Sequence, residues 1–145
     1  MHASRLLTEV HGSKKRKFNM LIDLQKAYDS VDRELLWRIL DSRCKDEDER
    51  KIVRLMIKLH RESDIIIGDQ HINAEIGLPQ GSILSPLLFN VYLEEAIKSS
   101  KKLEEVRTRG DLLAFADNKL VMSNAKGEMT WIINELDKLK DKWNL

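Results

Sequence analysis

Apolar residues along the chain fall into short blocks whose spacing alternates between that of strands and that of helices. Residues 18–22 form an apolar stretch that stops at Asp23, which is typical of a buried strand ending in a carboxylate. A second acidic position, Asp117, closes the first arm of a later hairpin. Strands are predicted at residues 18–22, 64–68, 71–76, 112–116 and 120–122, and the tip of the last hairpin is predicted to hold Asp117, Asn118 and Lys119.

Helices are predicted between these strands from apolar positions three and four residues apart. A short one is expected at residues 2–10, another after the N-cap Asp32, a third after the charged segment 46–50, and a last one near the end. Ser85 followed by Pro86 indicates a helix start, with serine as the cap, and this helix should run to about Ser99. The expected inward stripes are Leu35, Leu36, Ile39 and Leu40; Ile52, Val53, Leu55, Met56 and Leu59; and Ile132, Leu136, Leu139 and Trp143.

Composition sets limits on this picture. The chain has 145 residues, 42% of them hydrophobic, which suits one compact domain with a real core. The 25 basic and 24 acidic residues nearly balance, so any site for a polyanion must be local. Cys44 is the only cysteine, which excludes a disulfide framework. No apolar run reaches the ~18 residues that span a bilayer. We expect no membrane partner and an intracellular location, nuclear or cytoplasmic.

The candidate chemistry lies where the strands end. If the strand at residues 18–22 and the first arm of the later hairpin are neighbours in one sheet, Asp23 and Asp117 emerge at the same edge. Oxygen ligands without histidine or thiolate suit Mg²⁺ or Mn²⁺. Spacing alone leaves a second interpretation open, because an Asp-Asn pair at a hairpin tip is more often a turn former than a metal site.

Three segments in order favour the metal site. Residues 18–31, FNMLIDLQKAYDSV, resemble the first carboxylate motif of reverse transcriptases of the non-LTR retrotransposon (LINE-like) type. Residues 77–93, GLPQGSILSPLLFNVYL, are similar to the second motif over nearly its whole length. Residues 113–122, LAFADNKLVM, resemble the third, a hairpin that normally carries two consecutive aspartates. The resemblance implies an α/β (α+β) polymerase palm, a mainly antiparallel sheet with helices packed on one face.

The resemblance also implies roles for individual residues. Asp23 and Asp117 would bind the catalytic metals, Mg²⁺ or Mn²⁺, and the backbone carbonyl of Leu24 is a further candidate ligand. Tyr28 would lie against the sugar of the incoming nucleotide, although a core aromatic is the alternative. Gln80 and Gly81 would contact the nucleotide and template, where an ordinary loop before a capped helix is the alternative. We expect Asp29 to fix the local backbone.

The pattern departs from the family at Asn118, which stands where the second aspartate is usual and lacks its negative charge. A single palm domain over residues 1–145 would also lack the fingers expected before it and the thumb expected after it. The expected function is RNA-directed DNA polymerase chemistry, with an RNA or DNA template-primer and deoxynucleoside triphosphates, in a partial or degenerate copy of a retrotransposon. The alternative is a non-catalytic remnant that serves as a nucleic-acid-binding or protein-interaction module.

Other features have plainer explanations. The basic segment KKRK at residues 14–17 is a candidate phosphate-binding or nuclear-import patch, but a solvated loop is the favoured interpretation. Trp37, Trp131 and Trp143 are candidate stacking platforms for bases, but their helical spacing favours core packing. A palm-fold nucleotide cyclase is disfavoured, because residues 78–85 indicate a polymerase.

Overall fold

The computed structural model describes residues 18–24, 26, 28–61, 64–67, 70–73, 76–115 and 118–145. The helix expected at residues 2–10, the basic segment 14–17 and Asp117 lie outside this part of the chain. Within it, the strands are β1 (Phe18–Asp23), β2 (Asp64–Ile67), β3 (Gln70–Asn73), β4 (Leu112–Phe115) and β5 (Asn118–Ser123). The helices are α2 (Arg33–Arg43), α3 (Glu47–Arg61), α4 (Ser85–Lys98), α5 (Lys101–Thr108) and α6 (Lys126–Trp143).

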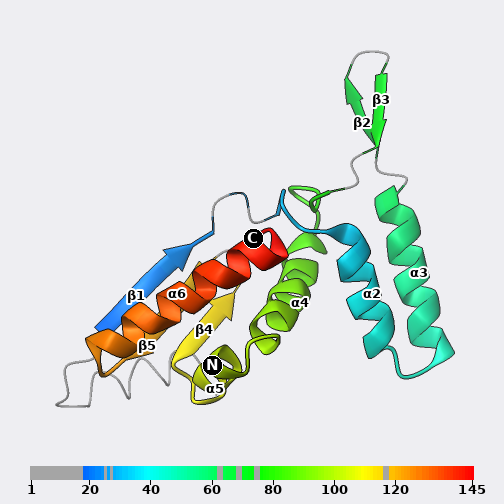
Figure 1. Ribbon diagram of the computed structural model, residues 1–145. Helices are drawn as coiled ribbons and strands as arrows, with labels where there is room; N and C mark the ends of the chain where they lie inside the picture. Colours follow the sequence, from blue (N-terminus) through cyan, green and yellow to red (C-terminus); the bar gives the residue numbers. More distant parts are fainter. Residues whose placement is uncertain are drawn as a thin grey trace.

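The strands form a three-stranded antiparallel sheet in the order β1-β5-β4 and a separate hairpin of β2 and β3. Figure 1 shows α4, α5 and α6 beside the sheet, with α2 and α3 beyond α4 and the β2–β3 hairpin projecting away from them. The predicted α+β architecture with a mainly antiparallel sheet is confirmed. No helix among the described residues is long and apolar enough to cross a membrane.

The helices pack on one face of the sheet. Residues paired across the ladder share a face, and Met20, Val121 and Leu112 are such a row. Val121 is 0% and Leu112 1% exposed within the common core, whereas Leu21, on the opposite face, is 80% exposed. The core is therefore built between the helices and a single face of the sheet, as predicted for a palm.

Helix α4 is the centre of the core. Its residues Phe89 and Tyr92 are 0% exposed. The Tyr92 hydroxyl donates a hydrogen bond to the backbone carbonyl of Trp143 at 2.9 Å, and the two rings meet edge to face. Burial raises the pKa of Tyr92. Trp37 and Trp143 are both buried, so core packing is confirmed for these two tryptophans. Trp131 is partly buried beneath the ammonium of Lys102.

Asp32 caps α2 as predicted, because its Oδ1 accepts a hydrogen bond from the Leu35 backbone N–H at 2.9 Å. We expect Asp32→Ala to lower the free energy of unfolding by about 1 kcal/mol, since an N-terminal amide of the helix loses its partner. Chemical denaturation measures the change. Asp41→Ala, which removes an exposed carboxylate from the other end of the same helix, is the control. An equal loss in both variants would contradict the capping role.

The predicted inward stripe of α3 was wrong in part. Val53 is buried, but Ile52, Leu55 and Leu59 are 61%, 56% and 53% exposed. Helix α3 packs along α2 by a narrow stripe that includes the buried His60, whose ring meets the ring of Trp37 edge to face. A helix with one packing partner buries one stripe, so the apolar residues beside that stripe remain on the surface.

Two further boundaries differ from the prediction. Helix α5 was missed, because it is short and mostly charged, although Leu103 and Val106 anchor it in the core. The predicted tip of the last hairpin was too long. Phe115 pairs directly with Asn118, so Asn118 and Lys119 belong to β5. Lys119 is only 2% exposed, and its ammonium lies 5.7 Å from the centre of the Phe89 ring.

Candidate active site

The first and third motifs meet at the end of β1. Asp23 is the last residue of this strand, and its Cα pairs with the Cα of Asn118 in the antiparallel ladder. The backbones of the two segments are therefore adjacent, but β1 pairs with the second arm of the hairpin, β5, whereas the prediction required pairing with the first arm, β4. Asp117 directly precedes Asn118 in the chain and lies outside the described residues, as do the side chains of Asp23 and Asn118. Within the described part, no cluster of three or more histidine, cysteine or acidic side chains could hold a metal ion.

The first and second motifs line one cavity beside this strand end. Its volume is ≈ 500 Å³, and its lining includes Tyr28, Gln80 and Gly81, which were predicted to contact the nucleotide, and Leu24, the candidate metal ligand. The sequence placed these residues in two distant segments, and the fold brings the segments together. The lining residues are Leu24, Lys26, Tyr28, Gln80, Gly81, Ser82, Ser85 and Pro86.

Hydrogen bonds join the two segments along their length. The Gly77 N–H donates to the Val31 carbonyl at 2.9 Å, and the Leu78 N–H donates to the Tyr28 carbonyl at 2.7 Å. At the cavity, Gln80 Nε2 donates to Asp29 Oδ1 at 3.2 Å. Asp29 therefore does more than fix its own backbone, because its carboxylate also positions the amide of Gln80.

Gly77 is required by this junction. Its φ of +86° lies in a region that side chains disfavour, and a Cβ at this position would lie 2.9 Å from the carbonyl oxygen of Asp29. Gly81 also has a positive φ, +87°, but a Cβ there would meet nothing within 4 Å. The first glycine permits close contact between two backbones, whereas the second permits a turn that borders the cavity.

Arg33 supports the same junction from α2, a role that no sequence pattern indicated. The side chain is 8% exposed, and Nε donates a hydrogen bond to the Gly77 carbonyl. Its Nη1 donates to the His60 carbonyl at 3.4 Å, which links α3 to the second motif. Burial lowers the pKa of Arg33. A buried arginine that binds two carbonyls fixes the position of the loop that carries Gly77.

Tyr28 combines the two interpretations drawn from the sequence. Its ring packs against the core, with its centre 5.2 Å from that of Phe89, and the residue also lines the cavity. The core contact holds the ring in place, and the cavity gives it a surface that a ligand can reach. Tyr28 is therefore a packed side chain in the wall of the cavity.

Ser85 was predicted to cap α4, and this prediction was wrong. Ser85 is the first helical residue, and its hydroxyl donates to the Pro79 carbonyl at 2.6 Å. Leu84 occupies the cap position without a side-chain hydrogen bond. Pro86 lies in the first turn, as predicted. The Ser85 hydroxyl binds the loop rather than the helix because the second motif folds back over it.

The end of α6 holds the loop that follows β1. Asn144 ends the helix in the left-handed conformation, with φ of 54°, and its Nδ2 donates to the Ser30 carbonyl at 3.0 Å. A residue in the last turn of the chain thus supports the cavity. Sequence spacing could not reveal this contact, because it joins positions that are far apart.

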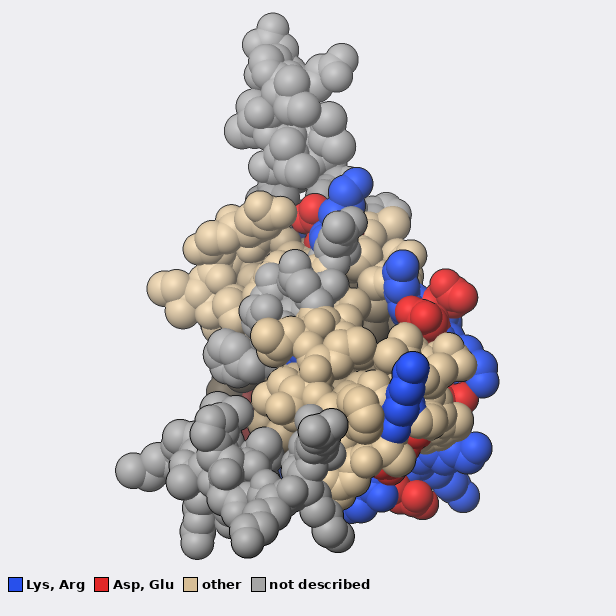
Figure 2. All heavy atoms as spheres, turned by 90° about the vertical axis from the view of Figure 1, so that its left-hand side faces the viewer, with Lys and Arg blue, Asp and Glu red and all other residues tan. Residues whose placement is uncertain are grey.

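One face of the described part of the molecule carries few charges at its centre. Figure 2 shows a largely uncharged centre among the described residues, with lysine, arginine and acidic side chains gathered toward one margin. The formal net charge of the chain is +1. Attraction of a polyanion therefore depends on local groups and not on an overall field.

Comparison with known proteins decides the ancestry. The sequence matches the family model of "Reverse transcriptase (RNA-dependent DNA polymerase)" over residues 2–145. The chain belongs to the reverse transcriptase family. It is also 32% identical over 77 residues to the "Putative COX1/OXI3 intron 2 protein" of Saccharomyces cerevisiae. That match covers 53% of this chain and 9% of the yeast protein.

The assignment of the three motifs to the reverse transcriptase family is confirmed, and the non-LTR subtype stays a prediction. Reverse transcriptases use divalent metals, a nucleic-acid template-primer and deoxynucleoside triphosphates. In the reverse transcriptase chain described here, the cavity formed by the first two motifs lies beside the strand end that carries Asp23. The segments that carry the family resemblance thus lie close together in the structure.

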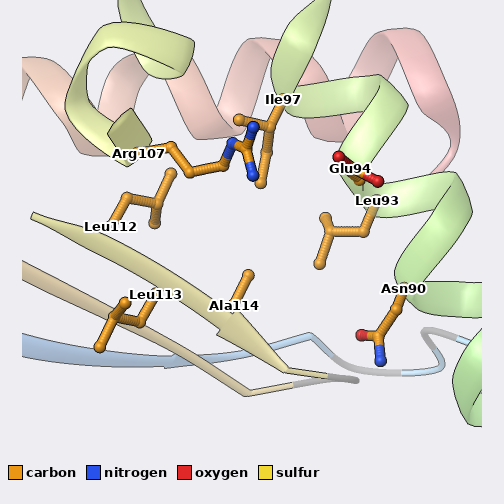
Figure 3. A pocket seen from close by; sticks show the side chains of 8 residues that line it. All are labelled: Asn90, Leu93, Glu94, Ile97, Arg107, Leu112, Leu113 and Ala114. Atoms are coloured by element: carbon orange, nitrogen blue, oxygen red, sulfur yellow. The ribbon is translucent and has the colours of Figure 1, made fainter. Parts of the chain in front are cut away.

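A second cavity in this reverse transcriptase chain, of ≈ 420 Å³, lies between α4, α5 and β4 and contains none of the predicted site residues (Figure 3). Its charged groups already have partners. Glu94 contacts Lys98 at 2.9 Å and Arg43 at 3.0 Å, and these cations lower its pKa. Arg107 contacts Glu104 at 2.7 Å. The Arg43–Glu94 pair links α2 to α4, whereas the Lys98–Glu94 and Arg107–Glu104 pairs lie within α4 and α5, so all three have a structural role.

Proposed function

We propose that this chain carries the nucleotidyl-transfer site of an RNA-directed DNA polymerase. The supporting observation is that Leu24, Tyr28, Gln80 and Gly81 line the same cavity, beside the end of β1. The substrates would be a template-primer of RNA or DNA and deoxynucleoside triphosphates. Primer extension in the presence of Mg²⁺ or Mn²⁺ tests the proposal, and incorporation that persists in a metal chelator would contradict it.

Asp23 and Asp117 fit a pair of divalent metals in this proposal. The ladder places the backbone of Asp23 opposite that of Asn118, the residue after Asp117. Carboxylate oxygens are hard ligands and suit Mg²⁺ or Mn²⁺. Two such ions would supply activation of the attacking 3′-hydroxyl and stabilisation of the leaving phosphate. The backbone carbonyl of Leu24 is a further proposed ligand.

The protein's own groups would position the nucleotide. Tyr28, held against Phe89, would lie against the sugar and screen its 2′ position. Gln80, held by Asp29, would present its amide to the incoming nucleotide and the template. Phosphoryl transfer depends mainly on positioning and charge stabilisation, so these fixed side chains are where the protein contributes most.

We further propose that the chain is a degenerate copy from a non-LTR retrotransposon, in an intracellular compartment. The support for this subtype is the length of the second-motif resemblance, residues 77–93. Fingers and thumb segments would complete the clamp around a primer-template duplex. The yeast relative is described as an intron protein, so an intron-encoded lineage is the competing subtype.

Asn118 favours a second function, a non-catalytic remnant that binds nucleic acid or protein. Replacing the usual aspartate with asparagine removes a negative charge from the strand end opposite Asp23. If the chain is a damaged enzyme, Asn118→Asp should raise primer extension by about 10- to 100-fold, because metal binding is strengthened. The rate of nucleotide incorporation measures the change.

The control for this substitution is Asn124→Asp, which adds the same charge at an exposed position after β5. It should leave incorporation unchanged. Absence of extension in the wild type and in Asn118→Asp, with both proteins folded, would contradict the polymerase proposal and support the remnant.

A further inference from the structure

The cavity of ≈ 500 Å³ has a single formally charged residue among the described residues that line it, Lys26. The other lining residues are apolar or carry hydroxyl, amide or phenol groups, or are glycine. Lys26 is exposed, so its side chain stays in contact with solvent. Among the described residues of the lining, the formal charge is therefore positive and comes from Lys26.

The backbone of Lys26 is strained. Its φ is 56°, in the left-handed region that non-glycine residues rarely adopt and that costs a lysine more than a glycine or an asparagine. Two hydrogen bonds to its carbonyl hold this conformation, from the Asp29 N–H at 3.0 Å and from the Ser30 hydroxyl at 3.1 Å. The turn fixes the point from which the lysine side chain leaves the backbone.

A residue that served only to turn the chain would be better as glycine at this position. The lysine side chain adds nothing to the hydrophobic core, since it is exposed. A strained position that keeps a long cationic side chain beside a ligand-sized cavity indicates a role in binding. The complementary ligand is an anion.

We propose that Lys26 binds the triphosphate of the incoming nucleotide, as a cation supplied by the palm itself. This inference rests on the proposed function and adds to it the position of the phosphates. An ammonium offers three N–H donors and a compact charge, which suits phosphate oxygens. Tyr28 and Gln80 line the same cavity, so sugar, base edge and phosphates would share one site.

Binding of inorganic tripolyphosphate in a metal-free buffer tests the inference by isothermal titration calorimetry. Lys26→Gln and Lys26→Gly should each weaken binding about tenfold, since a charge-assisted contact is lost. Lys101→Gln, which removes an exposed lysine past the opposite end of α4, should change the affinity less than twofold. Lys26→Gly should also raise the midpoint of thermal unfolding, because it relieves the strain.

Equal affinities of the wild type and Lys26→Gln for tripolyphosphate would overturn the inference. So would equal weakening by Lys101→Gln, which would indicate attraction to overall charge. Primer extension separates this result from the proposed function. If Lys26→Gln extends primers with an unchanged KM for deoxynucleoside triphosphates, the polymerase proposal stands and the role of Lys26 is excluded. If tripolyphosphate binding depends on Lys26 but no primer is extended, the phosphate site stands and the polymerase proposal is excluded.

Discussion

Asp23→Ala is expected to lower primer extension by roughly 10³-fold, which is the size of effect that loss of one charge-stabilising group has on a transfer reaction. Asp23 ends β1, and its backbone pairs with that of Asn118, so the substitution removes the carboxylate of the first motif from the strand end where the third motif begins. Incorporation of labelled deoxynucleotide with Mg²⁺ or Mn²⁺ measures the rate.

The control is Asp41→Ala, which removes an exposed carboxylate from α2. It should keep the wild-type rate, and circular dichroism should show that both variants are folded. If Asp23→Ala and the wild type incorporate nucleotide equally, Asp23 is not a metal ligand and the assignment of the site fails.

Gly77→Ala is expected to lower the free energy of unfolding by about 3 kcal/mol, from a disfavoured positive φ and from a Cβ within contact of the neighbouring backbone. The added methyl group would lie 2.9 Å from the Asp29 carbonyl oxygen. The second motif would have to move away from the first, and the Leu78–Tyr28 hydrogen bond would lengthen. Denaturant unfolding measures the loss of stability.

Gly127→Ala is the matched control, because a Cβ at Gly127 in α6 would meet nothing within 4 Å. It should leave stability unchanged or raise it by up to about 1 kcal/mol, since alanine favours a helix over glycine. A similar small effect in both variants would show that the junction at Gly77 tolerates a side chain.

Local patterns predicted much of the fold. The cap at Asp32 was visible because a short acidic side chain precedes an apolar helical stripe, and the structure confirms it. The apolar stretch ending at Asp23 predicted β1, and the motif at residues 77–93 predicted the loop and helix that border the cavity. These features depend on neighbours in the sequence, so the sequence alone reveals them.

The remaining features depend on partners that are distant in the chain. Arg33 was not singled out, because a lysine or arginine at the start of a helix is usually solvated, and only the fold brings it to the Gly77 carbonyl. Asn144 reaches Ser30 in the same way. The exposed side of α3 was misjudged because periodicity gives the apolar positions but not the number of packing partners. No sequence pattern indicated Lys26, because its backbone conformation and not its residue type distinguishes it.

The junction between the first two motifs separates two kinds of evolutionary constraint. Gly77 and Arg33 hold the two motifs together, so a descendant that had lost catalysis would still be selected to keep them for folding. Lys26 weakens the fold by its strain, so such a descendant would gain by losing it. Among related sequences, substitution of Lys26 together with retention of Gly77 would therefore indicate that catalysis was lost while the fold was kept.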